Sequence, residues 1–201
     1  DGLSLLETIK KVKPTILLGV SGVGGIFTQD VVEAMAECNE RPIIYPLSNP
    51  TEKCECTAEN AFKWTNGTVV FASGSPFPPV RYNQKTHLIS QANNMFVFPG
   101  LGMGSVLAGA SSVTNGMLHA ASVALASTVN QESLNEGLVY PRVREIRNAS
   151  IAVAVAVIKQ AIAEDNYSLK KLAQMDDSQL RQYVEKRMYY PEYQSIVPIA
   201  K

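Results

Sequence analysis

The sequence predicts an α/β protein, in which part of a doubly wound parallel sheet is followed by a helical region and a C-terminal tail. Three short apolar runs alternate with helical segments over the first 74 residues, as in strands joined by crossover helices. From residue 93 onward the chain is rich in Gly, Ala and Ser and keeps a helical period, which favours closely packed helices.

The first half is expected to alternate strands and helices after a short N-terminal helix. Apolar side chains at helical spacing predict that helix over residues 4–12, and Pro14 ends it. The run "TILLGV" (15–20) is continuously apolar, as in parallel strands buried on both faces. The elements that follow are a helix over 29–38 with Thr28 as N-cap, a strand "PIIYPLS" over 42–48, a helix "AENAFKW" over 58–64 that Thr57 caps and Gly67 closes, and a strand "VVFASG" over 69–74.

The second half is expected to be mainly helical. Residues 82–91 are polar and irregular, and the small-residue helical segment that follows leads to a break at Pro141. Two more helices are predicted, over about 144–164 and 177–187, before an irregular tail. We divide the chain into a partial sheet domain (1–93), a helical region packed beside it (94–165), and a C-terminal helix and tail (166–201).

The composition indicates which partners and which cellular compartment to expect. Lys plus Arg and Asp plus Glu number 18 each, so no basic face is forced and we expect no nucleic-acid partner. The longest apolar stretch, "IAVAVAVI" (151–158), is far shorter than the ~20 residues that span a bilayer, which predicts a buried helix and no membrane partner. Three cysteines, at 38, 54 and 56, suit a reducing compartment, and Cys54-Glu55-Cys56 lacks a second ligand pair for a metal. We expect an intracellular protein, in the cytoplasm rather than the mitochondrion, although this segment does not determine the compartment.

Small and polar residues follow each of the three predicted strands. Ligands of open α/β sheets bind at the carboxyl ends of parallel strands, where small residues let the backbone approach them closely. Turn conformation alone selects the same residue types, but the agreement of three strand ends favours a ligand-binding edge. The three ends are Val20-Ser21-Gly22, Leu47-Ser48-Asn49-Pro50 and Ala72-Ser73-Gly74-Ser75-Pro76.

The glycine-rich turn "GVSGVGG" (19–25) does not match the pyrophosphate loop of a dinucleotide site. The G-x-G-x-x-G loop would need a third small residue where Phe27 stands, and an acidic residue after the second strand, where Ser48 and Asn49 stand. The turn suits a later strand–helix connection of the same sheet, beside the ribose and nicotinamide. The first half of such a fold would then lie upstream of this segment.

Asn93 and Asn94 stand where the polar loop becomes helical. Amide groups suit the orientation of a small carboxylic acid, but Asn94 is equally suited to be a helix N-cap, and the spacing does not decide between these roles. No carboxylates are spaced to hold a divalent cation, no Gly-x-Ser-x-Gly motif occurs, and His87 and His119 lack a motif that supplies an orienting partner. We therefore assign no catalytic and no metal-binding residue to this segment.

At these residues the sequence resembles the malic enzymes, which oxidatively decarboxylate malate. The matching stretches are "LLGVSGVGGIFTQDVVEAMAECNERPIIYPLSNPTEKCECTAENAF", "VVFASGSPFPPV", "QANNMFVFPGLGMG" and "MLHAASVALA", and "YYPEYQSI" fits the C-terminal end of the family. The resemblance implies the C-terminal portion of such an enzyme, with residues 1–93 as the later part of a Rossmann-like NAD(P)-binding domain.

The resemblance also implies which residues bind the cofactor and the substrate. Asn49 and Asn94 would contact malate, and Asn93 remains an alternative to Asn94, because Gln91-Ala92 replaces the usual Gln-Gly. The family's Tyr acid, Lys base, metal-binding carboxylates, malate-binding Arg and first glycine loop match no position here. The residues implied to line the nicotinamide–ribose pocket are Val20, Ser21, Gly22, Leu47, Ser48 and Asn49.

The longer enzyme would convert malate to pyruvate and CO2 with NAD or NADP, using a divalent Mg²⁺ or Mn²⁺ ion bound outside this segment. It would be a homo-oligomer, a dimer or a tetramer, and we expect the segment alone to be inactive. Two alternatives stay open. One is a stand-alone α/β nucleotide-binding or regulatory module without catalysis; the other is a different 2-hydroxy-acid dehydrogenase, which would lack "SNPT" and the Asn pair in this order. The residues do not distinguish NAD from NADP.

Overall fold

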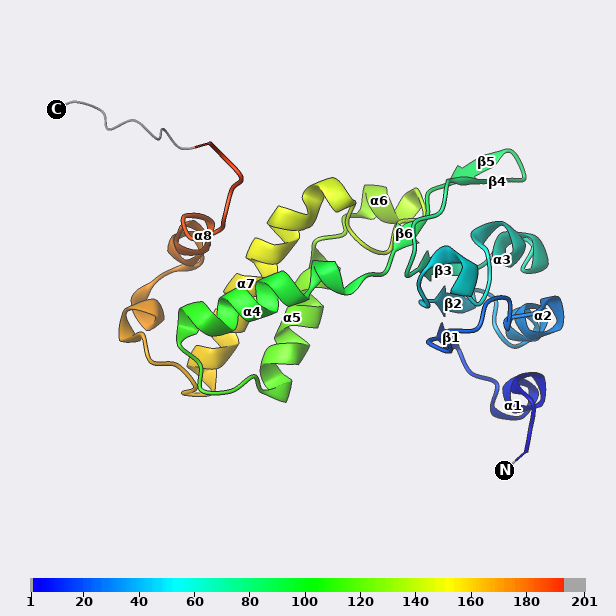
Figure 1. Cartoon of the computed structure of the whole chain (residues 1–201), viewed down its shortest axis with the longest axis horizontal. Helices are drawn as coiled ribbons and strands as arrows, with labels where there is room; N and C mark the ends of the chain where they lie inside the picture. The colour runs from blue at the N-terminus through cyan, green and yellow to red at the C-terminus, as the bar shows by residue number, and fades with distance from the viewer. Residues whose placement is uncertain (1, 194–201) are drawn as a thin grey trace.

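The computed structural model describes residues 2–193 and places a parallel sheet beside a group of helices (Figure 1). Helices α1 (Leu5–Val12), α2 (Gln29–Cys38) and α3 (Ala58–Trp64) lie on one side of the sheet. The predicted α/β fold with a parallel sheet is confirmed. In spatial order, the strands are β1 (Ile16–Gly19), β2 (Ile43–Pro46), β3 (Val70–Ser73) and β6 (Ser90–Gln91).

The sheet and α1–α3 share one hydrophobic core. Leu17, Ile44 and Phe71 are buried on three neighbouring strands. They belong to the same cluster as Val32 and Met35 of α2, both of which are completely buried. Burial of such side chains contributes roughly 1.5–3 kcal/mol each, so this core fixes which face of the sheet the helices cover.

Strand β1 is buried on one face only. Leu17 is buried, whereas Ile16 is 48% exposed and Leu18 is 57% exposed. The expectation that residues 15–20 are buried on both faces is therefore wrong for the part of the chain that the structure describes. The physical reason is that no described element packs against the second face of this edge strand.

The predicted caps lie at the helix ends. Thr28 and Thr57 are the N-cap residues of α2 and α3, although only Thr57 accepts a hydrogen bond, from the Asn60 N–H at 3.3 Å. Gly67 follows α3 with a φ of 81°, and its N–H donates to the Phe62 carbonyl at 2.8 Å. A residue without a Cβ suits this left-handed conformation, so Gly67 closes the helix as predicted.

Residues 82–91 are not irregular. Strands β4 (Val80–Tyr82) and β5 (Lys85–His87) form an antiparallel hairpin, and β6 then pairs in parallel with β3. The turn residues Asn83 and Gln84 have φ angles of 47° and 63°, as two-residue turns of the favoured hairpin type require. Strands of two or three residues are too short to show a period of two in the sequence, which is why the prediction was wrong.

The helical region packs α4 and α5 beside the long α7 (Figure 1). The predicted small-residue segment is divided, because Gly109, with a φ of 64°, ends α4 and Thr114 begins α5 by accepting from the Met117 N–H at 3.1 Å. The elements are α4 (Phe98–Ala108), α5 (Asn115–Ser127), α6 (Gln131–Asn135), α7 (Ile146–Ala163) and α8 (Asp177–Glu185), with 3-10 turns η1 (Thr51–Lys53), η2 (Asn94–Phe96), η3 (Val143–Glu145) and η4 (Lys170–Gln174).

Glycines let α4 approach α7 closely, which confirms the predicted use of the small residues. A Cβ at Gly100 would lie 2.6 Å from the Ser150 carbonyl oxygen, and one at Gly104 would lie 2.8 Å from the Ala154 carbonyl oxygen. The contact belongs to a second hydrophobic core, which α8 also joins. Its buried members are Leu101, Ala108, Met117, Ala121, Ile151, Val153, Ala154, Val157, Ile158, Ala161, Leu172, Leu180 and Val184.

Helix α7 is the longest helix of the described chain. By length and composition alone, Val143–Ala163 is able to cross a membrane. Its side chains at Val153, Val157 and Ile158 are completely buried in the second core. The apolar run over residues 151–158 is therefore a buried helix, as predicted, and packing within the protein accounts for its composition.

Candidate functional site

The carboxyl ends of four parallel strands meet at one edge of the sheet. The ladder continues one residue beyond the strands: the Leu47 N–H donates to the Gly19 carbonyl at 2.8 Å, and the Ala92 N–H donates to the Ser73 carbonyl at 2.8 Å. The sequence predicted three of these ends, and β6 adds the fourth. This strand brings Asn93 and Asn94, which follow it, to the same edge as the other turns.

A single buried carboxylate joins the turns after β1 and β2. One oxygen of Glu55 accepts from the Ser21 N–H and O–H, both at 2.8 Å, and from the Ser48 O–H at 2.5 Å. Its other oxygen accepts from the Ser48 N–H at 3.3 Å, and the Gly22 N–H donates to the Ser48 hydroxyl at 2.9 Å. Gly19 leaves room for this side chain, because a Cβ there would lie 2.6 Å from the Glu55 Cδ.

The Glu55 carboxylate is kept in its charged form. Burial by itself would raise the pKa of Glu55, but the hydrogen bonds from Ser48 and Ser21 outweigh it and hold the pKa below the ordinary value of 4.5. The side chain is 0% exposed. Glu55 thus contributes a fixed negative charge directly beneath two of the predicted cofactor-binding turns.

Sequence reasoning missed Glu55, because it considered Cys54-Glu55-Cys56 only as half of a metal site. Both cysteines are free and buried, and burial raises the pKa of Cys56 to about 12. The neutral thiols therefore pack as small apolar side chains. The available signal was a charged residue between two residues of a type that is usually buried.

The turns after β2 and β3 meet at Asn49. The Asn49 side-chain oxygen accepts from the buried Ser75 hydroxyl at 2.6 Å, and its amide nitrogen donates to the Leu47 carbonyl at 3.3 Å. Gly74 allows this approach, because a Cβ there would lie 2.8 Å from the Asn49 amide nitrogen. Asn49 is exposed, so its oriented amide faces the outside of the sheet edge.

Asn93 and Asn94 have different roles in the structure. Asn93 is the N-cap of η2, because its side-chain oxygen accepts from the Met95 N–H at 3.0 Å. Asn94 is exposed, and its side chain has no hydrogen-bond partner among the described residues. The sequence left open whether Asn94 is a cap; the structure gives that role to Asn93 and leaves the Asn94 amide available to a ligand.

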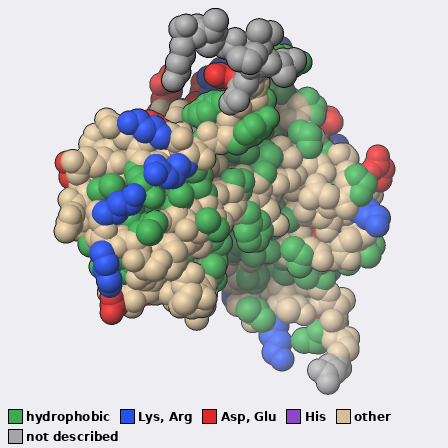
Figure 2. Space-filling view, turned by 60° about the vertical axis from the view of Figure 1, so that its left-hand side comes forward, with side chains coloured by type: hydrophobic (Ala, Val, Ile, Leu, Met, Phe, Trp, Pro, Cys, Tyr) green, Lys and Arg blue, Asp and Glu red, His purple; other side chains and the backbone are tan. Residues whose placement is uncertain are grey.

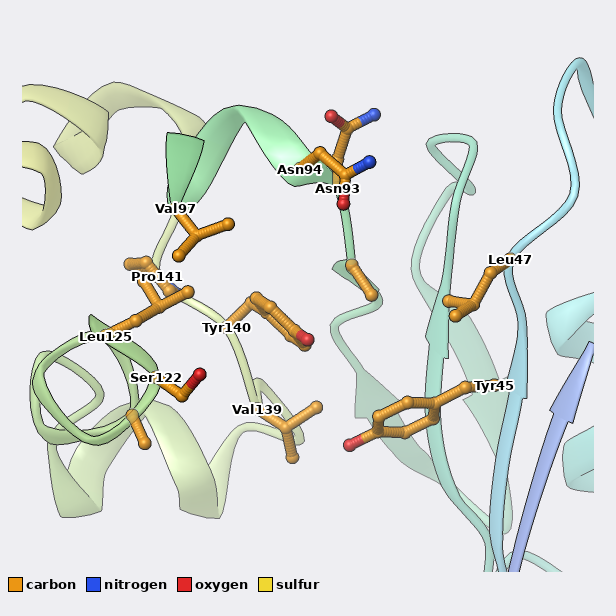
Figure 3. A pocket seen from close by; sticks show the side chains of 12 residues that line it. Tyr45, Leu47, Asn93, Asn94, Val97, Ser122, Leu125, Val139, Tyr140 and Pro141 are labelled. Atoms are coloured by element: carbon orange, nitrogen blue, oxygen red, sulfur yellow. The ribbon is translucent and has the colours of Figure 1, made fainter. Parts of the chain in front are cut away.

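A pocket of about 380 Å³ lies between this edge and the helical region (Figure 3). Tyr45 and Leu47 line it from β2 and its turn, Asn93 and Asn94 lie at one end, and Tyr140 reaches into it from the segment before α7. Burial, with a smaller contribution from Tyr140, raises the pKa of Tyr45 to about 12. Tyr45 therefore presents a neutral hydroxyl at neutral pH. The sequence did not single out either tyrosine.

Within residues 2–193, no group of three or more His, Cys, Asp or Glu side chains is placed to hold a metal ion. The His87 ring packs against Phe62, with ring centroids 4.5 Å apart, and His119 is exposed on α5. Neither histidine lines the pocket beside the Asn pair. Both match the predicted structural or solvent-exposed roles.

The predicted cofactor-binding residues are brought together, although their role stays a prediction. Val20 is 79% exposed, Ser21 and Gly22 are exposed, Leu47 is half-buried and Ser48 is buried. The N–H groups of Ser21 and Ser48 already donate to Glu55, and that of Gly22 donates to the Ser48 hydroxyl. A ligand would therefore meet the outer surface of these turns, not a row of free N–H groups.

Comparison with known sequences identifies relatives over nearly the whole chain. The family model described as the malic enzyme NAD-binding domain matches residues 1–162. An NADP-dependent malic enzyme from Vitis vinifera is 50% identical over 192 residues, which cover 95% of this chain and 32% of that protein. The mitochondrial NAD-dependent malic enzyme 2 from Arabidopsis thaliana is 43% identical, covering 98% of this chain and 34% of that protein. The chain thus spans about a third of the length of these curated relatives.

Solved structures agree with the fold. The crystal structure of the Entamoeba histolytica malic enzyme matches with a TM-score of 0.73 and 24% identity, over 91% of this chain and 33% of that one. The malic enzyme from Pyrococcus horikoshii matches with a TM-score of 0.69 and 24% identity, over 90% of this chain and 36% of that one. From the family model and the sequence relatives together, this chain belongs to the malic enzyme family.

Proposed function

We propose that the chain forms the later part of the cofactor-binding domain of a longer malic enzyme, which converts malate to pyruvate and CO2 with NAD⁺ or NADP⁺. The observation that carries the proposal is the shared edge of the sheet, where Asn49, Asn93 and Asn94 lie with the turns after β1, β2 and β3. Open α/β sheets bind ligands at this edge. Family membership and the names of the relatives support the choice of reaction.

In this proposal the turns Val20–Gly22 and Leu47–Asn49 receive the nicotinamide–ribose part of the cofactor, which accepts a hydride when it is bound. Asn49 and Asn94 hold malate by hydrogen bonds from their uncharged amide groups. Because Ser75 donates to the Asn49 side-chain oxygen and one Asn49 N–H donates to the Leu47 carbonyl, the second N–H of the NH2 group is left to donate to a substrate carboxylate. Fixing this amide before the substrate arrives favours one geometry for hydride transfer.

The divalent ion of the proposed reaction does not fit the described residues, because they offer no set of three acidic, His or Cys side chains at one place. We therefore assign Mg²⁺ or Mn²⁺ to residues of the longer protein outside this chain and derive no step through the ion. The proton-transferring groups are assigned there as well, and a homo-oligomer is part of the same proposal.

The test is an assay of the complete protein that carries this chain. It is expected to reduce NAD⁺ or NADP⁺ only when malate and Mn²⁺ are both present, and to release pyruvate. The 201-residue chain at the same molar concentration is expected to be inactive. A complete protein that binds the dinucleotide without reducing it would favour a regulatory or nucleotide-binding module and contradict the proposal.

A further inference from the structure

We propose that Glu55 is a positioning residue of the cofactor site, whose buried carboxylate holds the turns after β1 and β2 in the geometry that binds nicotinamide dinucleotide. The inference rests on the function proposed above, because it assumes that these turns receive the cofactor. Glu55 is 0% exposed and does not reach the surface of the site. Its contact with a ligand is therefore indirect, through Ser21, Gly22 and Ser48.

The carboxylate connects the two turns symmetrically. It accepts one N–H and one O–H from Ser21 of the first turn, and one N–H and one O–H from Ser48 of the second. The Ser48 hydroxyl also accepts from the Gly22 N–H, so a continuous chain of hydrogen bonds runs from the first turn to the second. Removing the carboxylate would leave both turns without their shared partner.

The backbone around Glu55 holds the other end of the first turn. The Gly25 N–H donates to the Cys54 carbonyl at 3.0 Å, and the Phe27 N–H donates to the Glu55 carbonyl at 3.0 Å. The segment before α3 therefore anchors the long connection between β1 and α2 at both ends, by its side chain near Ser21 and by its backbone near Phe27. Apart from Phe27, which is buried in the first core, residues 20–28 are exposed, so these hydrogen bonds fix the connection to the rest of the protein.

The arrangement requires a carboxylate in particular. No lysine or arginine forms an ion pair with Glu55 among the described residues, so only hydrogen-bond donors balance its charge. A Gln side chain of the same shape would turn one acceptor into an NH2 donor, which would face the donors of Ser21 or Ser48. Burying a charge also costs desolvation free energy, so a buried carboxylate contributes little net stability. This favours a role in specifying the geometry of the turns.

The experiment compares Glu55→Gln with Glu59→Gln in the complete protein. Glu59 lies four residues further along on α3 and is exposed, so it is a matched control that removes a charge outside the site. Binding of NADH and NADPH is followed by fluorescence titration. Hydrogen exchange is measured by mass spectrometry on peptides that contain residues 20–23 and 47–49.

We expect Glu55→Gln to weaken dinucleotide binding about tenfold, the change that follows the loss of one hydrogen bond to a charged group. The KM for the cofactor should rise more than kcat falls. Exchange should become faster in the two turn peptides and stay unchanged in the peptide that contains β2. Glu59→Gln should match the wild type in every measurement.

A role limited to stability would lower the melting temperature of Glu55→Gln but leave the dinucleotide Kd and the cofactor KM of the folded protein unchanged, and that result would overturn the proposal. If Glu55→Gln does not fold, Glu55→Asp keeps the charge and retracts the carboxylate by one methylene. An unchanged Kd in a folded Glu55→Asp protein would count equally against the positioning role.

The titration separates this proposal from the proposed function, because binding needs no turnover. If the wild type binds the dinucleotide but does not oxidise malate, the proposed function fails, and the Kd of Glu55→Gln still decides the role of Glu55. If the wild type binds neither NADH nor NADPH, both proposals are wrong.

Discussion

The two adjacent asparagines after β6 have different roles, because one caps a helical turn and the other is free to bind a ligand. The side chain of Asn93 is occupied by the cap of η2, whereas Asn94 is exposed and has no described partner. Caps of this kind contribute about 1 kcal/mol to stability, so Asn93 has a structural role in any case. The proposed malate contact therefore belongs to Asn94.

Asn94→Ala in the complete protein is expected to raise the KM for malate about tenfold, the size of effect that one lost hydrogen bond to a charged group produces. The KM for the cofactor should change by less than twofold (~0.4 kcal/mol) because the cofactor turns are untouched. Steady-state kinetics with each substrate varied in turn measures both values. Asn93→Ala is the matched control: it should lower the melting temperature, with a smaller effect on malate. An unchanged malate KM in Asn94→Ala would remove Asn94 from the site.

The pH dependence of stability is expected to depend on Glu55. Because its pKa in the folded protein lies below 4.5, its ordinary value, the ionised group stabilises the fold fully above that pH and loses this contribution as the pH falls through the folded pKa. At neutral pH the wild type should exceed Glu55→Gln by about 2 kcal/mol in free energy of unfolding. Urea unfolding between about pH 7 and pH 3 should show this difference shrinking on acidification. A difference that is constant over the whole range would contradict the assignment.

Individual glycines set the packing of α4 on α7. Gly104 faces α7, where a Cβ would lie 2.8 Å from the Ala154 carbonyl oxygen, whereas a Cβ at Gly102 on the same helix would meet nothing within 4 Å. The position in the helix therefore decides whether a glycine-to-alanine substitution stabilises or destabilises the protein.

Gly104→Ala is expected to destabilise the protein by roughly 1–3 kcal/mol, because the backbone carbonyl of α7 must move away. Gly102→Ala should stabilise it by about 0.5–1 kcal/mol, since alanine restricts the unfolded chain and fits an exposed helical site. Thermal unfolding of the two variants beside the wild type measures both effects. Equal effects of the two substitutions would show that α4 does not pack on α7 through Gly104.

The sequence predicts the elements that have a clear period and misses those that are too short to have one. The apolar runs of β1, β2 and β3 and the helices between them follow from residue patterns of 4 to 10 residues. The hairpin and β6 do not, and β6 is the strand that brings the Asn pair to the site. Glu55 was missed for a different reason: the flanking cysteines indicate its burial, but its partner Ser21 lies 34 residues away, so no local pattern shows that it connects two turns.

The described chain exposes apolar side chains on the outer face of its edge strand and on the helical region. Ile16 and Leu18 of β1 are about half exposed, and Val106 of α4 is 78% exposed. Figure 2 shows hydrophobic side chains spread over much of one face. Patches of this kind are covered in most soluble proteins by another element or another chain.

The 201-residue chain produced alone is therefore expected to self-associate. Leu18→Lys, which places a charge on the outward face of β1, should reduce the association, because charged edge strands resist pairing. Light scattering after size-exclusion chromatography measures the mass of both forms. A monomer of 21.8 kDa at high concentration without the substitution would contradict this expectation.

In the proposed enzyme, one edge of the sheet receives both the cofactor and malate. The most direct measurement is a crystal structure of the complete protein with NAD⁺ or NADP⁺ and a non-reacting dicarboxylic acid. We expect the nicotinamide and its ribose to lie against Val20–Gly22 and Leu47–Asn49, with the Asn49 and Asn94 amides hydrogen-bonded to the acid. A cofactor bound elsewhere, or an acid that touches neither asparagine, would contradict it.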